Sequence, residues 1–180
     1  MRVAQRKEIG VGLALSQKWP REVVAILGVL LVSLNLSTPA HASVAQGAIY
    51  GSGTVTDDWG DEGPLSTTQY SFSNAVALWQ AVLYADGYLT DWAADGDCRF
   101  GAKTRTATIA WQRDRGLSAD GIVGPATFGK ADDRLTLSGN RVTYHGKVSN
   151  LSDMYRAASG RYEDYDRHFS YILANFPICR

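Results

Sequence analysis

Apolar residues recur at helical spacing in three stretches of the chain. In the first stretch, Val76, Trp79 and Leu83 stand three and four residues apart, which predicts a helix with one buried face. Ser73 can cap the start of this helix, and Gly87 follows where a left-handed C-cap residue is favoured. We therefore predict a helix over residues 73–86.

Two further helices are predicted downstream. Residues 102–115 are followed by Gly116 as a cap, and Gly124 with Pro125 begins a short helix over residues 125–132, where the missing N–H of proline costs nothing. The inward face of the second helix would carry Thr104, Ala107, Thr108 and Trp111. Together the three helices predict a mainly α fold, a three-helix bundle.

Beyond residue 133 the spacing of apolar residues changes to alternation. Leu135, Leu137, Val142 and Tyr144 alternate with polar residues, and Gly139-Asn140 between the two pairs is a hairpin signal. Ser159-Gly160 predicts a second turn. Residues 136–180 are therefore predicted to form a small, β-rich, hairpin-containing extension packed on the helices.

The N-terminal 42 residues have the composition of a secretory signal peptide. A positively charged start precedes an apolar stretch over residues 23–36 and the small-x-small triplet that ends at Ala42. The apolar stretch is shorter than the roughly 20 residues of a membrane span. An uncleaved N-terminal anchor is the alternative to cleavage after Ala42.

Residues 43–71 are rich in Gly, Ser, Thr and Asp and show no apolar period. Such a stretch buries too little surface to offset the entropy of ordering it, so we expect a flexible linker. Trp59 and Tyr70 are the large rings in it that could dock on the folded part.

Charge and cysteine content narrow the class of protein. Residues 43–180 hold 13 Lys and Arg against 16 Asp and Glu, which argues against a nucleic-acid partner, and no membrane partner is expected after cleavage. Cys98 and Cys179 are the two cysteines, and an even pair in an exported chain is usually a disulfide. Two free thiols are the alternative.

The helical stretch contains an internal repeat. Trp79-Gln80 recurs as Trp111-Gln112, and residues 97–104 and 120–127 share the pattern Asp-x-x-apolar-Gly-x-x-Thr. In each copy the Asp can hold a tight turn, the Gly allows a sharp entry into the helix, and the Thr can reach loose backbone groups. The residues predicted to build these turns are Asp97, Gly101, Thr104, Asp120, Gly121, Gly124 and Thr127.

On these motifs, residues 72–135 resemble the peptidoglycan-binding domain family, a three-helix module found beside many cell-wall hydrolases. The ordered set that carries the resemblance is Val76, Trp79-Gln80, Leu83, Gly87-Tyr88, Asp97, Phe100-Gly101, Thr104, Ala107, Trp111-Gln112, Gly116-Leu117, Asp120-Gly121-Ile122-Val123-Gly124 and Thr127-Phe128. Two features depart from the family: Asp97-Cys98 replaces the usual Asp-Gly, and residues 89–95 are longer than the minimal pattern. The resemblance implies binding to cell-wall peptidoglycan, outside the cell, by the module alone.

Peptidoglycan offers sugar rings and stem peptides with carboxylates, so a binder needs aromatic faces and positive charge. Arg99, Lys103 and Arg105 flank the start of the second predicted helix, whose free N–H groups favour an anion. Tyr88 and Trp92 lie in the long loop of the first repeat and could form a sugar platform. The alternatives are a solvated charged turn and two rings that cover the core.

Catalytic motifs are absent from the sequence. It has no His-Glu-x-x-His zinc spacing, no Gly-x-Ser-x-Gly elbow and no glycine loop for a phosphate cofactor, so we expect no metal and no cofactor. Acids such as Glu163, Asp164 and Asp166, or a polar cluster of Asp153, Arg156, His168 and Tyr171, are candidates by residue type alone. Non-catalytic wall binding is the main hypothesis. A small wall hydrolase that uses the C-terminal extension and a wall-tethered protein-interaction module remain alternatives.

Overall fold

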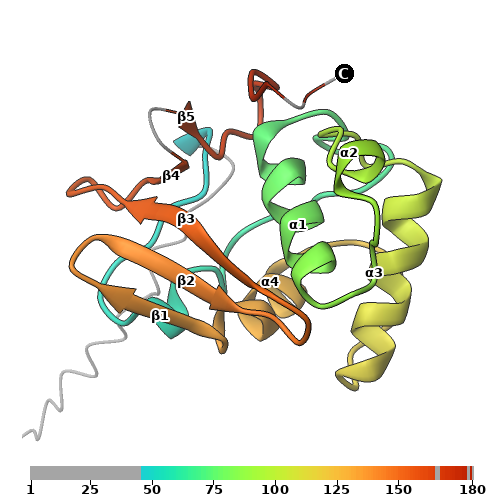
Figure 1. Ribbon diagram of the computed structural model, residues 1–180, viewed down its shortest axis with the longest axis horizontal. Coiled ribbons are helices and arrows are strands. Elements are labelled where there is room, and N and C mark those ends of the chain that lie inside the picture. Colours follow the sequence, from blue (N-terminus) through green and yellow to red (C-terminus); the bar gives the residue numbers. More distant parts are fainter. Residues whose placement is uncertain (1–45, 165–166, 178, 180) are drawn as a thin grey trace, which may run out of the picture. The chain divides into compact units, whose positions relative to one another are not determined.

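The computed structural model describes residues 46–164, 167–177 and 179 (Figure 1). The predicted signal peptide and its cleavage site lie outside the described residues. The elements follow one another as a 3-10 turn Val55–Asp57, helices α1 (Asn74–Ala85), α2 (Trp92–Asp95), α3 (Ala102–Asp114) and α4 (Pro125–Asp132), then strands β1 (Leu135–Ser138), β2 (Arg141–His145), β3 (Asn150–Arg156), β4 (Tyr162–Asp164) and β5 (Arg167–His168). Within these residues no helix has the length and apolar character needed to cross a membrane.

Helix α1 is the central element of the described unit. Ser73 caps it by accepting a hydrogen bond from the backbone N–H of Val76 at 3.3 Å, as the sequence predicted. Ten of its twelve residues are buried, and α1 contacts α3 on one side and β3 on the other. A helix that is apolar around most of its circumference is a core helix, which explains why α1 lies between the sheet and α3 in Figure 1.

The five strands form one antiparallel sheet in the order β1-β2-β3-β4-β5. Ser138 pairs with Arg141 across the two-residue turn Gly139-Asn140, so the predicted hairpin is confirmed. Arg156 pairs with Tyr162 across the second predicted turn, where Gly160 has a φ of +90°. A Cβ at Gly160 would lie 2.5 Å from the carbonyl oxygen of Gly51, so both backbone angle and space require glycine there.

The expectation of a mainly α three-helix bundle with a small β extension is wrong. The described residues hold four α-helices and a five-stranded antiparallel sheet, and both share one core. Tyr144 of β2 and Tyr162 of β4 are fully buried in the same cluster as Trp79 and Trp111 of the helices. The apolar faces of the strands therefore complete the helical core, which is why the helices alone do not define the fold class.

The expectation of a flexible linker over residues 43–71 also fails for its described part, residues 46–71. Ile49, Trp59 and Leu65 are fully buried. Backbone bonds join Ile49 to Phe169 and Leu65 to Val123 at 2.9–3.0 Å. The segment lacks a regular period because it crosses the molecule irregularly, and a few widely spaced large residues anchor it.

Trp59 shows how this segment joins the helices to the sheet. Its ring meets Phe128 of α4 at 6.1 Å and Tyr162 of β4 at 5.6 Å, both edge to face. Tyr70, the other ring of the segment, is partly exposed and contacts Tyr171 at 5.3 Å. Both rings therefore contact the folded part.

The predicted disulfide Cys98–Cys179 is confirmed, with a Cα–Cα distance of 5.0 Å and a sequence separation of 81 residues. A loop of this length corresponds to about 4 kcal/mol on the chain-entropy model. The bridge fastens the C-terminal segment to the first turn, whose Cys98 carbonyl also accepts a hydrogen bond from Ser73 N–H at 3.1 Å.

Candidate functional site

The first turn of the helical module is organised by one buried glutamine. The side-chain amide of Gln80 donates to Asp97 Oδ1 at 2.8 Å, to the Arg99 carbonyl at 3.0 Å and to Thr104 Oγ1 at 3.1 Å. Its carbonyl accepts from Cys98 N–H at 2.9 Å. Gln80 thus satisfies the polar groups of a turn that would otherwise be buried without partners.

The second turn repeats these bonds position by position. Gln112 donates to Asp120 Oδ1 at 3.0 Å, to the Ile122 carbonyl at 2.8 Å and to Thr127 Oγ1 at 3.0 Å, and it accepts from Gly121 N–H at 2.9 Å. The two turns named from the sequence pattern therefore make the same set of hydrogen bonds.

Backbone geometry agrees with these bonds. Cys98 and Gly121, at the same position of the two turns, have φ values of +64° and +74°. Gly101 and Gly124 are the extended N-cap residues of α3 and α4. The cysteine of the first copy thus stands in a left-handed conformation that favours glycine, and the disulfide is formed from that position.

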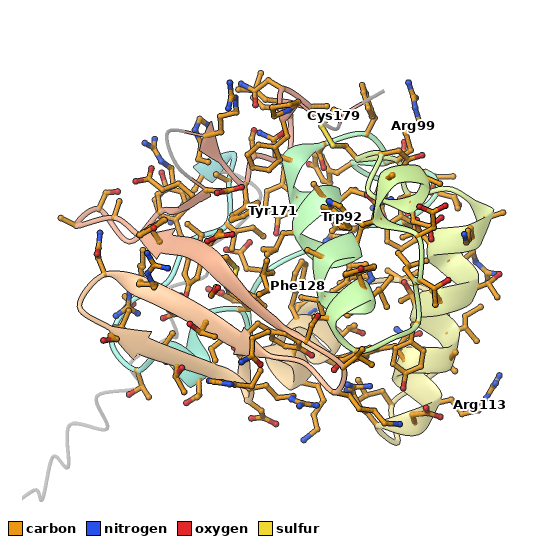
Figure 2. All side chains as sticks on the ribbon, viewed as in Figure 1. Trp92, Arg99, Arg113, Phe128, Tyr171 and Cys179 are labelled. Atoms are coloured by element: carbon orange, nitrogen blue, oxygen red, sulfur yellow. A yellow bond between two sulfur atoms is a disulfide. The ribbon has the colours of Figure 1, made fainter. Side chains whose placement is uncertain are left out.

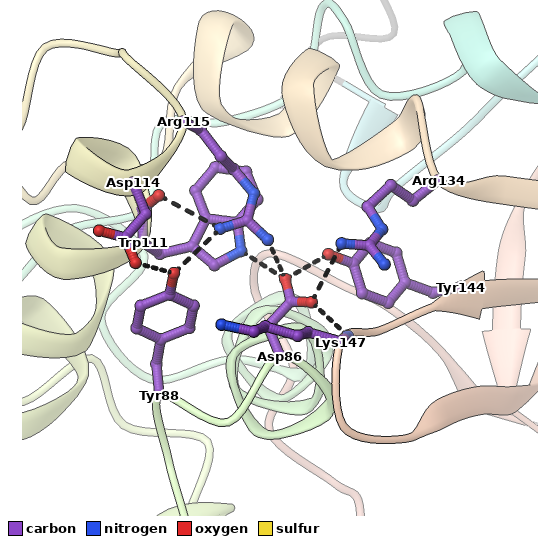
Figure 3. A network of polar contacts seen from close by, with 8 residues as sticks. All are labelled: Asp86, Tyr88, Trp111, Asp114, Arg115, Arg134, Tyr144 and Lys147. Atoms are coloured by element: carbon purple, nitrogen blue, oxygen red, sulfur yellow. Dashed lines mark hydrogen bonds and ion pairs between the residues drawn. The ribbon is translucent and has the colours of Figure 1, made fainter.

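Asp86, directly after α1, joins the module to the sheet (Figure 3). Its side chain is fully buried. Its oxygens accept hydrogen bonds or form ion pairs with Trp111 Nε1 at 2.8 Å, Tyr144 Oη at 2.6 Å, Lys147 N at 2.8 Å, Arg115 Nη2 at 2.5 Å and Arg134 Nη1 at 3.5 Å. Burial, and then the bond to Asp86, raises the pKa of Tyr144, so its phenol stays a donor. These donors offset the free-energy cost of burying the charged carboxylate of Asp86.

A surface depression of about 560 Å³ opens beside Asp86, and we call it the basic pocket. It is lined by Tyr88, Asp114, Arg115, Lys130, Asp133, Arg134 and Lys147. Four of these seven side chains are cationic and come from the ends of α3, α4 and β2 or from the residues just after them.

The cations of the basic pocket are held in different ways. Arg115 and Arg134 pair with Asp86, and Lys130 pairs with Asp133 at 2.8 Å. Arg115 also lies 3.8 Å from the centroid of the Trp111 ring, which fixes its plane. The ammonium group of Lys147 contacts no partner within the described chain. The pocket therefore combines an immobilised guanidinium with an ammonium that is available to an anion.

Tyr88 forms the aromatic wall of the basic pocket. Its hydroxyl donates to Asp114 Oδ2 at 2.6 Å and accepts from Arg115 at 3.3 Å (Figure 3). Burial, and then the bond to Asp114, raises its pKa, so the phenol is neutral at physiological pH. A ring face beside oriented cations suits a ligand that carries both apolar surface and a carboxylate.

The five residues predicted to bind ligand do not converge on one site. Tyr88 lies in the basic pocket, whereas Trp92 begins α2, packs against Tyr84 at 5.7 Å and lines a different cavity. Figure 2 shows Trp92 at α2 and Arg99 at the edge of the molecule. Tyr88 and Trp92, which belong to the same long loop, therefore line two separate cavities.

The predicted cations at the start of α3 are engaged locally. Arg99 lies 4.1 Å from the centroid of the Phe72 ring, and Lys103 pairs with Asp95 at 2.5 Å. Arg105 donates to a carbonyl of the second turn at 3.1 Å. Each of the three side chains therefore already has a partner within the described residues.

Sequence reasoning missed Arg115, Arg134 and Lys147. A usable signal was present, because Arg115 and Arg134 follow closely after helices, where a cation is favoured by the helix dipole. Lys147, in the loop between β2 and β3, had no such signal, since its place beside Asp86 depends on how the sheet packs against α1.

The polar cluster suggested as catalytic does not assemble. Arg156 pairs with Asp58 at 2.7 Å, and Tyr171 donates to the buried Glu62 at 2.5 Å. Asp166 lies outside the described residues. Within the described ranges no group of His, Cys, Asp and Glu side chains could hold a metal ion.

Comparison with models of known protein families gives a match for the helical part of the chain. Residues 73–130 match the model of the family described as "Putative peptidoglycan binding domain". No curated protein and no solved structure matches the chain. The matched segment contains α1, both turns and most of α4, which are the parts that the two glutamines organise. Residues 73–130 are thus similar to the peptidoglycan-binding domain family.

Proposed function

We propose that this protein binds peptidoglycan in the bacterial cell wall without cleaving it. The family match over residues 73–130 carries the proposal. The expected location is outside the cell. An N-terminal segment with signal-peptide composition and the disulfide Cys98–Cys179 both support export, because disulfides persist in oxidising compartments.

The basic pocket is the proposed binding site, and its proposed ligand group is a stem-peptide carboxylate. Lys147 offers an unpaired ammonium, and Arg115 offers a guanidinium whose plane is fixed by Trp111 and Asp86. A carboxylate between them would gain charge-assisted hydrogen bonds without reordering Arg115. Tyr88 would contact the apolar part of the same peptide.

The test is retention on purified sacculi by the oxidised protein, together with analysis of soluble products. We expect the wild type to sediment with sacculi, and Lys147→Ala to weaken retention about tenfold, which is the effect of losing one charge-assisted bond. Arg113→Ala is the matched control, because Arg113 is an exposed cation of α3 that does not line the pocket and lies at the edge of the molecule in Figure 2.

Three outcomes would contradict the proposal. Wild-type protein that stays in solution would show that the protein does not bind the wall. Equal losses of sacculus retention in Lys147→Ala and Arg113→Ala would show that retention depends only on the net charge of the protein. Released sugars or peptides would show that the protein is a hydrolase.

A further inference from the structure

A second cavity, of about 210 Å³, lies between α1, α2, β3 and the C-terminal segment. We call it the Trp92 cavity. Its apolar walls are formed mainly by Ala77, Ala81, Trp92, Met154, Phe169 and Phe176. It is smaller than the roughly 300–1,000 Å³ of pockets that hold drug-sized ligands, so its size suits a single side chain.

The Trp92 cavity is built into the fold. Helix α1 contributes two alanines where larger residues would fill the space. On the opposite side, Phe169 and Phe176 pack edge to face at 5.4 Å. The segment that carries Phe176 is fixed by hydrogen bonds to the buried Asn74, including Asn175 N–H to Oδ1 at 2.9 Å, and by the disulfide at Cys179.

Two carboxylates, Asp153 and Asp164, interrupt the apolar lining. Oδ1 of Asp164 is buried, and no donor from the described chain reaches it. Burial and the charge of Asp153 raise the pKa of Asp164, while Arg167, its partner in the β4–β5 register, acts in the opposite direction. Because the pKa of Asp164 stays raised in spite of Arg167, a further cation at the cavity would stabilise the ionised carboxylate.

We propose that the Trp92 cavity binds the ammonium end of an aliphatic amine, the chemistry of a lysine side chain. The methylene groups would contact Met154 and Phe169, and the Trp92 ring would face the cation. The ammonium would lie against the Asp164 carboxylate where this residue lines the cavity, and in the field of Asp153. No basic side chain lines the described cavity, so the positive charge comes from the ligand.

The biological identity of the amine rests on the proposed function. A peptidoglycan stem peptide carries carboxylates and, on its diamino acid, an amino group. The basic pocket would take the first group and the Trp92 cavity the second. The two sites are lined by different residues, so each can be removed without the other.

The experiment is a titration of the oxidised full-length protein with pentylamine, followed by amide NMR shifts at neutral pH, with pentanol as the uncharged counterpart. We expect pentylamine to shift residues that line the cavity and to bind at least tenfold more tightly than pentanol. Asp164→Asn should reduce pentylamine affinity at least tenfold. Glu163→Gln is the matched control, since Glu163 is the preceding acid on β4 but does not line the cavity.

A second variant tests the cavity without removing a charge. Ala81→Leu fills the hollow and should abolish both pentylamine and pentanol shifts while the remaining spectrum stays native. Equal binding of the amine and the alcohol, equal losses in Asp164→Asn and Glu163→Gln, or unchanged binding in Ala81→Leu would each overturn the proposal. Sacculus retention is measured separately, so loss of wall binding with intact amine binding would refute the proposed function alone.

Discussion

Tyr144 of β2 donates a hydrogen bond of 2.6 Å to Asp86, the residue that directly follows α1, and both side chains are fully buried. The bond joins the sheet to the helical module at the place where Arg115 and Trp111 also reach the carboxylate. The module and the sheet therefore share a polar centre as well as an apolar core, and disturbing this centre should affect both.

Asp86→Ala should be strongly destabilising. It leaves Arg115 and several donors without their acceptor, and breaking a buried ion pair in this way costs about 3–5 kcal/mol. Urea unfolding followed by tryptophan fluorescence measures the loss. Asp133→Ala, which breaks an exposed pair with Lys130, should cost less than about 1 kcal/mol. Similar losses in the two variants would contradict the role given to Asp86.

Local sequence signals predicted the parts of the fold that depend on nearby residues. Ser73 as a cap, Gly139-Asn140 as a turn and the two Asp-x-x-apolar-Gly-x-x-Thr turns all depend on residues within about 30 positions. Residues 46–71 gave no such signal. Trp59 packs on Phe128 and Tyr162, about 70 and 100 positions away in the sequence. The periodicity of apolar residues does not predict contacts over such separations.

The candidate site was only partly predictable for the same reason. Tyr88 was identified because it is an aromatic residue in the long loop of the first repeat, whereas its pocket partners Arg134 and Lys147 are brought to it by the packing of the sheet. Arg99 and Lys103 had the expected exposure and charge, but a sequence does not reveal that Phe72 and Asp95 already contact them.

Stability should fall as pH rises from mildly acidic to mildly alkaline values. Burial raises the pKa of Glu62 from 4.5 to about 8 and that of Asp132 from 3.8 to about 7. A raised folded-state pKa means that the folded protein binds the proton more tightly, so this contribution is complete below the unfolded pKa and is lost by about pH 8. Each pKa unit is worth about 1.4 kcal/mol.

Thermal unfolding at several pH values between 4.5 and 8 measures this slope. Asp132→Asn keeps an acceptor for the backbone N–H of Trp59, which is bound at 2.8 Å, and should flatten the curve without removing that bond. Burial lowers the pKa of His168, which opposes the trend below about pH 6.5, so the comparison between variant and wild type is decisive. A wild-type Tm that rises across this range would refute the assignment.

Gln80 and Gln112 should contribute equally to the free energy of unfolding, although their surroundings differ. Gln80→Ala and Gln112→Ala each remove an NH2 group that is within hydrogen-bond distance of three acceptors, together with one accepted bond, and leave buried groups of the turn without partners. We expect each to cost about 2–4 kcal/mol, several times a typical single hydrogen bond. Chemical unfolding under oxidising conditions compares the two. A loss confined to one variant would show that the turns are not energetically equivalent.

The disulfide requires a cysteine side chain at position 98, whereas the backbone conformation there favours glycine. Its φ of +64° is the conformation that Gly121 adopts in the second turn, and a side chain there is strained. Removing the bridge as Cys98→Ser with Cys179→Ser should cost about 4 kcal/mol, because a long loop is released. The pair Cys98→Gly with Cys179→Ser loses the same bridge but relieves the backbone, so it should be about 1 kcal/mol more stable than the serine pair. Urea midpoints of the two variants measure the difference, and a serine pair as stable as the glycine pair would show that the first turn tolerates a side chain without strain.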